Sequence, residues 1–441
     1  MRRDIEKELL SWKSQKGRQP LVIRGARQVG KSYLVETFGK AHFKNCVTVD
    51  FEFQPQLKEC FRSFDPSEIV NKLQMLLGVK IDKNETLLFL DEIQESPRAL
   101  MSLRYFKEKM PELSVIAAGS LLEFALKKPD FKMPVGRIQF IYLEPLSFGE
   151  YLDASGNGRL RQFLSGLKAT DKIDDAIHEK LLECLRTYLI VGGMPAVLKD
   201  YLDSKDMMNT QRMQTGIIQA YRSDFGKYAG LSRHQYLEKV FDAAPRLVGQ
   251  RIKYSGIDPD SRSRDLKDAL NLLSLAGLVK IVYSTSASGL PLGADINERK
   301  FKLNFLDVGL MQNACGLEGR LSVEKDFIQI NAGAVAEQFA GQELRAYSDS
   351  RRGGGLYFWA RDKRSSSAEV DYIIAVGADI LPVEVKSGKQ GKLRSLRVFL
   401  DEKKSKFGVR LSPGKLTFHD KILSIPLYMI EHLPRLVSSL E

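Results

Sequence analysis

The sequence is poor in cysteine and has no long run of apolar residues. Its four cysteines, Cys46, Cys60, Cys184 and Cys315, lie far apart, without the paired spacing of a zinc site or the density of a secreted disulfide framework. No apolar stretch is long enough to span a bilayer, and the amphipathic N-terminal segment lacks the apolar centre of a signal peptide. We therefore expect a cytoplasmic protein with reduced cysteines and no membrane partner.

The sequence does have ample apolar content and an excess of positive charge. Hydrophobic residues make up 43% of the 441 residues, which is typical of packed globular proteins. This length favours about two to four domains. The 67 basic and 55 acidic residues give a net charge of +12, so a polyanion such as nucleic acid is a natural partner. A charge that serves solubility alone is the alternative.

Five short apolar segments punctuate the first 145 residues: PLVIRG, CVTVDF, TLLFLDE, LSVIAAGS and RIQFIYLE. Each is separated from the next by a stretch of helical length and pattern. Short strands that alternate with helices predict a parallel α/β sheet. We assign residues 1–150 to this α/β domain.

The rest of the sequence predicts three further domains. Apolar spacing is helical in residues 151–235, with a turn at VGGMPAVL, residues 191–198. In residues 236–320, a helix over Asp265–Ala276 is stopped by Gly277 and followed by two strands, which suggests a winged helix. Residues 321–441 begin with a helix, AVAEQFAGQELRAY, and continue with three strands and another helix, a second α/β pattern.

The segment GARQVGKS at 25–32 matches the phosphate-binding P-loop (Walker A) pattern between a predicted strand and a predicted helix. Its glycines let the loop curl so that backbone N–H groups face the phosphates of ATP. Lys31 is expected to reach the β- and γ-phosphates, and Ser32 to offer its hydroxyl to Mg²⁺. The predicted nucleotide-binding residues here are Gly25, Ala26, Arg27, Gln28, Val29, Gly30, Lys31, Ser32 and Tyr33.

A second motif, LLFLDE at 87–92, ends a buried strand in two carboxylates, as in Walker B. Asp91 is expected to hold Mg²⁺ through water, and Glu92 to orient and activate the attacking water. The strand LSVIAAGS ends in Ser120 and would lie between the P-loop strand and the Walker B strand. Ser120 could then sense the γ-phosphate.

Six motifs, GARQVGKS, FLDEIQ, AAGSLLEF, GRIQFIYLEPLSFGEYL, GGMPAVL and FKLNFLDVGLM, resemble the prokaryotic AAA-type ATPases that carry a C-terminal domain of unknown function. The resemblance covers essentially the whole chain. It implies that Arg137, just before the fifth strand, enters a neighbouring subunit's site in a homo-oligomer. It also implies, by likeness to related signalling ATPases, that Pro195 packs against adenine; a plain helix-breaking role is the alternative.

The C-terminal domain of that family is similar to the PD-(D/E)XK nuclease fold, and Glu337, Asp371, Glu384 and Lys386 carry the comparison. Glu384 and Lys386 lie two residues apart on a predicted strand, hence on one face, and a hairpin would bring Asp371 beside them. Carboxylates suit Mg²⁺, which activates water, while Lys386 would stabilise developing charge. Glu337 on the preceding helix would complete the metal site. Surface charges on a hairpin are the alternative.

Two basic stretches are candidate phosphate contacts. Residues 386–415 contain ten basic and two acidic residues beside the predicted metal site. Arg262, Arg264 and Lys267 stand at the start of the predicted recognition helix, where major-groove contacts are made. A solvated helix face and a domain-packing role are the respective alternatives.

These observations favour an ATP-hydrolysing AAA-type module coupled to a nucleic-acid-binding module whose C-terminal site cuts DNA. The alternative from another class is a STAND-like switch, in which ATP controls assembly and the nuclease-like domain only binds. Transport or protein remodelling is disfavoured, because the sequence shows no membrane segment and no aromatic pore-loop motif of an unfoldase.

Overall fold

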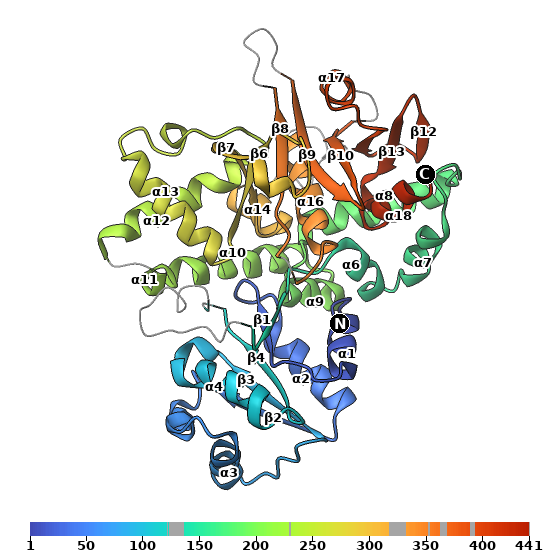
Figure 1. The fold of residues 1–441 in the computed structure, drawn as a ribbon. Coiled ribbons are helices and arrows are strands. Elements are labelled where there is room, and N and C mark those ends of the chain that lie inside the picture. The colour runs from blue at the N-terminus through green and yellow to red at the C-terminus, as the bar shows by residue number, and fades with distance from the viewer. Residues whose placement is uncertain are drawn as a thin grey trace. The chain divides into compact units, whose positions relative to one another are not determined.

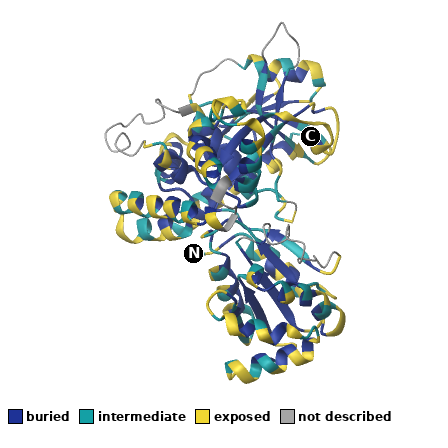
Figure 2. Ribbon diagram, turned by 90° about the vertical axis from the view of Figure 1, so that its left-hand side faces the viewer, coloured by how far each residue is buried: buried dark blue, intermediate teal, exposed yellow. Residues whose placement is uncertain are grey.

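The computed structural model describes residues 1–120, 122, 136–228, 231–316, 332–351, 353–361, 368–388 and 393–440 (Figure 1). The chain divides into two compact units. The first comprises Met1–Glu144 and Asp349–Gly353, and the second comprises Pro145–Ser348 and Gly354–Glu441. In both units the strands are largely buried, and exposed residues concentrate on helices and loops (Figure 2).

The first unit is built on a five-stranded parallel sheet of order β2-β3-β4-β1-β5. All five expected strands are present, and β4 lies between β1 and β3 as expected. The strands are β1 (Leu21–Arg24), β2 (Asn45–Asp50), β3 (Thr86–Asp91), β4 (Ser114–Ala118) and β5 (Gln139–Tyr142). The helices are α1 (Glu6–Ser14), α2 (Lys31–His42), α3 (Pro66–Leu77) and α4 (Pro97–Lys109), with 3₁₀ turns η1 (Pro55–Arg62) and η2 (Ile93–Glu95).

The core of the first unit lies on the sheet. Every residue of β3 and β4 is buried, which explains why these strands read as continuous apolar runs rather than as alternating patterns. Leu88 and Leu90 of β3 share a buried cluster with Leu103 and Phe106 of α4. Burying these four side chains contributes roughly 1.5–3 kcal/mol each. The carboxyl ends of the strands are thereby held at one edge of the sheet.

The second unit contains an eight-stranded mixed sheet of order β12-β13-β11-β10-β9-β8-β6-β7. Its strands are β6 (Val279–Thr285), β7 (Ile296–Phe305), β8 (Tyr357–Ala360), β9 (Glu369–Val376), β10 (Asp379–Val385), β11 (Gly408–Ser412), β12 (Thr417–His419) and β13 (Ile422–Pro426). The expected order of one helix, three strands and another helix is confirmed by α16, β8, β9, β10 and α17.

Helices flank this sheet within the second unit (Figure 1). They are α6 (Phe148–Ala154), α7 (Gly158–Gly166), α8 (Asp175–Val191), α9 (Pro195–Ser204), α10 (Met207–Ser223), α11 (Phe225–Tyr228), α12 (Leu231–Ala243), α13 (Ser263–Leu275), α14 (Val308–Ala314), α16 (Ala332–Ala346), α17 (Arg394–Lys403) and α18 (Leu433–Ser438). Short 3₁₀ turns are η3 (Ala244–Leu247), η4 (Tyr254–Gly256), η5 (Leu292–Asp295) and η7 (Leu427–His432). Among the described residues, no helix is long and apolar enough to cross a membrane.

The expected helix and two strands of the winged-helix segment are α13, β6 and β7. The β6–β7 hairpin is not separate from the C-terminal strands, because β6 pairs in parallel with β8 through Tyr283 and Ser284. One sheet therefore runs through both of the domains that we separated at residues 320 and 321. The four-domain division stays a prediction.

A buried polar network joins three of the sequence motifs inside the second unit. Asp307 accepts hydrogen bonds from the N–H groups of Gly193 at 2.6 Å and Leu310 at 3.0 Å. A Cβ on Gly192, whose φ is +76°, would lie 2.1 Å from Asp307 Oδ1. Glu343 accepts from the N–H of Phe148 at 3.0 and 3.1 Å. The GGMP and LDVGL motifs are thus joined by buried hydrogen bonds within the second unit.

We predict that Glu343→Gln reduces the pH dependence of stability. Burial raises the pKa of Glu343 from 4.5 to about 8. The folded protein therefore keeps a proton that the unfolded chain releases above pH 4.5. This stabilisation is complete below that pH and is lost as the pH rises to about 8, by up to about 1.4 kcal/mol per pH unit. Thermal melts between pH 5 and 8 should show a shallower Tm slope in the variant. An unchanged slope, equal to that of the exposed control Glu179→Gln, would contradict this role.

Candidate functional site

The loop after β1 has the backbone of a phosphate-binding loop. Gly25 has φ +149°, and a Cβ there would lie 2.3 Å from the carbonyl oxygen of Leu143. Gly30 has φ +92° and immediately precedes α2. Both positions therefore require glycine. The N-terminus of α2 presents N–H groups without intrahelical partners, which favour an anion.

Lys31 is buried below this loop. Its ammonium donates to the carbonyl oxygens of Ala26 at 2.8 Å and Gly25 at 3.1 Å. Burial lowers the pKa of Lys31 to about 8, although Glu92 and Asp91 oppose the shift. No carboxylate is recorded within hydrogen-bonding distance of this ammonium among the described residues, so a phosphate would supply its missing counter-charge.

The other predicted residues of the loop divide by exposure. Ala26 and Val29 are buried and anchor the loop, Arg27 and Ser32 are half-buried, and Gln28 and Tyr33 are exposed. Gln28 has φ +67°, a left-handed conformation that is costly for a residue with a Cβ. Such strained backbone conformations are typical of functional loops rather than of loops shaped by their own packing.

Asp91 and Ser32 form the pair that would hold Mg²⁺. Burial raises the pKa of Asp91 to about 6, while a hydrogen bond from Ser32 opposes the rise. Asp91 Oδ1 also accepts from the N–H of Glu92 at 2.9 Å. A hydroxyl and a carboxylate in contact beside a phosphate-binding loop fit the oxygen-rich coordination that Mg²⁺ prefers.

Glu92 is held in a defined orientation. Its Oε2 accepts from Gln94 Nε2 at 2.6 Å, from Ser120 Oγ at 3.3 Å and from the N–H of Ser120 at 3.4 Å. Its backbone is left-handed, with φ +46° and ψ +47°. Such strain, of order 1–3 kcal/mol, is typical of functional positions. Ser120 therefore contacts the predicted catalytic carboxylate; its role as a γ-phosphate sensor stays a prediction.

Two residues of this site were missed by sequence reasoning. Gln94 contacts Glu92 and approaches so closely that a Cβ on Gly119 would lie 2.2 Å from Gln94 Oε1. Arg3, which is buried, donates to the carbonyl oxygens of Val29 at 3.1 Å and Glu144 at 2.7 Å and so braces the loop. Gln94 was visible within the FLDEIQ motif. Arg3 carried no signal, because its contacts lie far along the chain.

Arg137 lies away from its own chain's P-loop. It precedes β5, whereas the P-loop follows β1, and these strands run parallel with Leu21 opposite Gln139. The two ends of a four-residue strand are about 13 Å apart, at ~3.3 Å per residue. Arg137 instead forms an ion pair with Glu108 at 3.0 Å, with half its side chain exposed. Arg137 therefore does not reach its own chain's P-loop, and its entry into a neighbouring subunit's site stays a prediction.

Pro195 is the first residue of α9 in the second unit. Proline suits this position because the first N–H groups of a helix have no intrahelical acceptor, so the N–H that proline lacks costs no hydrogen bond. The adenine contact that the family resemblance implies stays a prediction.

The predicted C-terminal residues converge, but around a lysine. The ammonium of Lys302 on β7 lies 3.0 Å from Glu337 Oε1, 2.7 Å from Glu369 Oε1 and 3.4 Å from Asp371 Oδ1. Its side chain is 2% exposed. Burial would lower the pKa of Lys302, but the three carboxylates outweigh burial and raise it above its usual value. Lys302 and Glu369 were not predicted.

Glu384 and Lys386 pair with each other beside this cluster. Lys386 Nζ lies 2.6 Å from Glu384 Oε1. Glu384 Oε2 is buried with no hydrogen-bond partner. Burial, reinforced by Asp371, raises the pKa values of both Glu337 and Glu384 to about 7. Both carboxyl groups thus resist ionisation in the folded protein.

The predicted metal set does not fit a divalent ion as it stands. Within the described part of the chain, no group of three or more His, Cys, Asp or Glu side chains is arranged to hold one. An ammonium already lies among Glu337, Glu369 and Asp371. We therefore derive no chemistry through a metal at this site.

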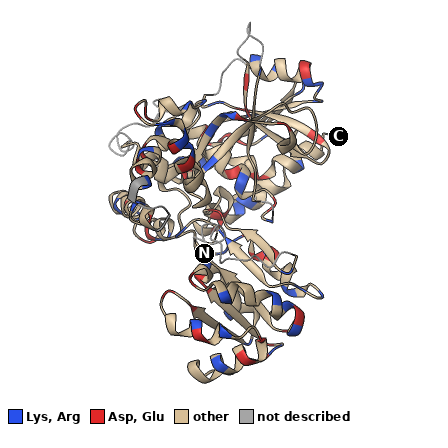
Figure 3. Ribbon diagram, turned by 60° about the vertical axis from the view of Figure 1, so that its left-hand side comes forward, with Lys and Arg blue, Asp and Glu red and all other residues tan. Residues whose placement is uncertain are grey.

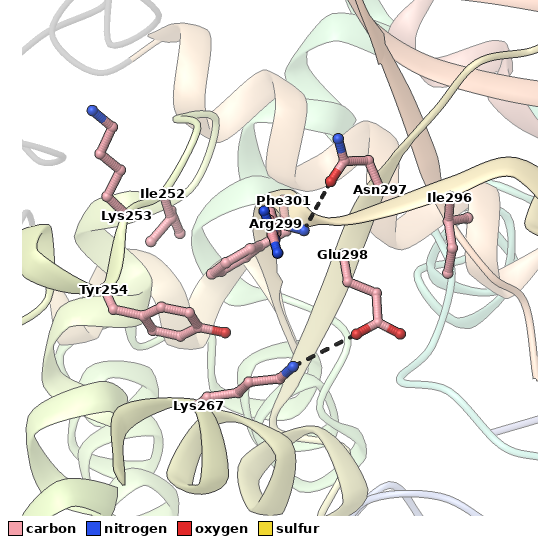
Figure 4. Close-up of a pocket in the computed structure, with 9 residues that line it drawn as sticks. All are labelled: Ile252, Lys253, Tyr254, Lys267, Ile296, Asn297, Glu298, Arg299 and Phe301. Atoms are coloured by element: carbon pink, nitrogen blue, oxygen red, sulfur yellow. Dashed lines mark hydrogen bonds and ion pairs between the residues drawn. The ribbon is translucent and has the colours of Figure 1, made fainter. Parts of the chain in front are cut away.

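A separate basic recess lies between the start of α13 and β7 (Figure 4). Its volume is about 750 Å³. In Figure 4 the hydroxyl of Tyr254 and the ammonium of Lys267 face Glu298, and Lys267 pairs with that carboxylate at 3.6 Å. The lining residues are Ile252, Lys253, Tyr254, Lys267, Ile296, Asn297, Glu298, Arg299 and Phe301.

Comparison with known families gives three matches along the chain. Residues 17–152 match an AAA domain. Residues 182–321 and 332–429 match two domains of unknown function, DUF8612 and DUF4143. No curated protein matches the chain.

Among solved structures, the chain is similar to a Walker-type ATPase of Pyrococcus abyssi, with 17% identity, TM-score 0.46, and coverage of 71% of this chain and 95% of that one. It is also similar to the ORC2 protein of Aeropyrum pernix, with 15% identity, TM-score 0.33, and coverage of 72% and 92%. The RuvB Holliday junction branch migration motor of Thermotoga maritima matches with 12% identity, TM-score 0.29, and coverage of 67% and 91%. These scores are too low to carry an argument. The AAA match and the parallel sheet with its P-loop carry it, and they show that the first unit contains an AAA-type P-loop ATPase-like domain.

Proposed function

We propose that the protein binds ATP with Mg²⁺ in its first unit, hydrolyses it, and uses the nucleotide state to control nucleic-acid binding by its second unit. The observation that carries the ATPase half is the orientation of Glu92. Gln94 and Ser120 hold its carboxylate, and Glu92 contributes to the electrostatics of both Lys31 and Asp91. Binding groups and a water-orienting carboxylate therefore belong to one site.

Each residue has a defined part in the proposed reaction. Lys31 and the N–H groups at the start of α2 bind the β- and γ-phosphates, and Ser32 and Asp91 would hold Mg²⁺, which would add positive charge beside these phosphates. Glu92 orients a water whose oxygen attacks the γ-phosphorus as the bond to the β-phosphate oxygen breaks. ADP and inorganic phosphate leave, and the proton of the water passes to solvent or phosphate. Positioning and electrostatics supply the rate.

The nucleic-acid half of the proposal is supported by the surface around α13. Arg262 and Arg264 are exposed at the start of this helix, with no ion pair recorded for either among the described residues. Lys253 and Arg299 add positive charge around Tyr254 in the adjoining recess. Exposed cations at a helix start, next to a β-hairpin and an aromatic ring, suit phosphate and base contacts. Lys and Arg are otherwise spread over both units (Figure 3).

DNA cleavage, which the family resemblance implies, is not part of this proposal. Lys302 lies among the predicted metal ligands, and this observation favours the second reading, an ATP-switched nucleic-acid-binding protein whose nuclease-like domain does not cut. The two readings share the ATPase and differ only in the fate of the bound nucleic acid.

We predict that Lys31→Ala lowers ATP affinity at least ~10-fold, because the phosphates lose their buried cation. Glu92→Gln should keep ATP affinity while lowering kcat by ~100-fold or more, because the water loses its orienting carboxylate. Fluorescent-nucleotide titration and phosphate release measure the two effects. Lys40→Ala, which removes an exposed lysine from the last turn of α2, is the control. Undiminished turnover in Glu92→Gln would remove this residue from the mechanism.

We predict that the double variant Arg262→Ala, Arg264→Ala weakens DNA binding and lowers the slope of log K against log salt by about 1 per lost phosphate contact. Fluorescence anisotropy from 50 to 200 mM salt measures the slope. Arg159→Ala, Arg212→Ala removes two exposed arginines from α7 and α10 and serves as the charge-matched control. Equal slopes in the two double variants would place the binding surface elsewhere.

We extend the proposal to homo-oligomers in which Arg137 completes the neighbouring site, in keeping with its position at the opposite sheet edge. Arg137→Ala alone and Glu92→Gln alone should each be nearly inactive. Mixing them should restore part of the activity, because some sites then combine an intact Glu92 with an intact Arg137. No recovery across a range of mixing ratios, with oligomers present by light scattering, would exclude the role in trans.

A further inference from the structure

In the carboxylate cluster around Lys302 in the second unit, each N–H donor of the ammonium has a carboxylate partner. An ammonium has three N–H donors and no acceptor. Lys302 directs them at three carboxylates, those of Glu337, Glu369 and Asp371, at 2.7 to 3.4 Å. The ring of Phe358 lies 5.4 Å from the same nitrogen. The cation is therefore enclosed and satisfied by side chains of the protein itself.

The carboxylate oxygens that a metal would need are already engaged. Asp371 Oδ2 accepts from the N–H of Val385 at 2.8 Å, while its Oδ1 faces Lys302. Glu369 also pairs with Arg251 at 2.6 Å, and Glu384 Oε1 is held by Lys386. Among the described carboxylates, only Glu384 Oε2 is buried with no hydrogen-bond partner, so Mg²⁺ would have to take its other ligands from water or from oxygens that already have partners.

We propose that the Lys302 ammonium takes the place of a divalent cation in the second unit, so that the nuclease-like carboxylate cluster is a metal-independent ion-paired core. The three carboxylates would repel one another in a buried site unless a cation lay between them. A lysine on β7 meets this need permanently, whereas a metal would have to displace it or bind beside a like charge. The inference is independent of ATP hydrolysis and of nucleic-acid binding.

The sign of a stability change tests this proposal without any activity assay. With Lys302 as the central cation, Glu337→Gln or Asp371→Asn at pH 8, above the pKa of about 7 of Glu337, removes one of the three charged partners of the buried ammonium. Each variant should then lower the Tm by at least ~3 °C in EDTA. In a carboxylate cluster that binds a metal, EDTA leaves the carboxylates to repel one another. Neutralising one of them would then raise the Tm. A raised Tm in EDTA would overturn the proposal. Glu298→Gln, an exposed change of the same charge, is the control.

Metal binding gives a second, independent readout. Mn²⁺ titration followed by electron paramagnetic resonance, without nucleotide, should count the same number of sites in the wild type and in Asp371→Asn. Lys302→Met should gain one site, and Lys302→Met with Asp371→Asn should lose it again. A wild-type site that Asp371→Asn removes would contradict the proposal. That comparison stands even if Lys302→Met fails to fold.

Discussion

Parallel strand pairing determines where every group of the nucleotide site lies. Because β4 lies between β1 and β3 and all three run the same way, the residues that follow them meet at one sheet edge. The P-loop follows β1, Asp91 ends β3 with Glu92 directly after it, and Ser120 follows β4. The contact between Glu92 and Ser120 is thus a consequence of the sheet order. Because Arg137 precedes β5, which is parallel to β1, it lies at the opposite end of the strands.

A different constraint organises the second unit, where buried polar and charged groups need partners. Asp307 and Glu343 are fully buried, and each is met by backbone N–H groups from distant motifs. Lys302 is met by three carboxylates. Removing one partner from such a group is costly, because a buried polar group that loses a hydrogen bond cannot replace it with water. These buried hydrogen bonds and ion pairs therefore hold together motifs that lie far apart in sequence.

Features encoded by residues close together in the sequence could be predicted, whereas contacts between residues far apart in the sequence were missed. All five strands of the first unit and the residues of both nucleotide motifs were predicted, because local patterns of apolar residues and glycines encode them. Arg3, Lys302 and Glu369 were missed. Lys302 is 35 and 69 positions from Glu337 and Asp371, and no local spacing signals such a pairing. The pairing of β6 with β8 was missed for the same reason. Two of the three carboxylates around Lys302, Glu337 and Asp371, were predicted, whereas Glu369 and the cation between them were not.

Two buried lysines show how the surroundings decide what the same side chain can do. Among the described residues, the Lys31 ammonium donates hydrogen bonds only to backbone carbonyls, and burial lowers its pKa to about 8. Lys302 is just as buried, yet three carboxylates raise its pKa. A phosphate arriving at Lys31 supplies the negative charge that the site lacks, so its binding is strongly favoured. An anion near Lys302 would meet an ammonium whose charge the carboxylates already balance. A metal cation would have to bind beside the like charge of that ammonium. The surroundings of Lys31 therefore favour the proposed phosphate ligand, whereas those of Lys302 disfavour any further ion.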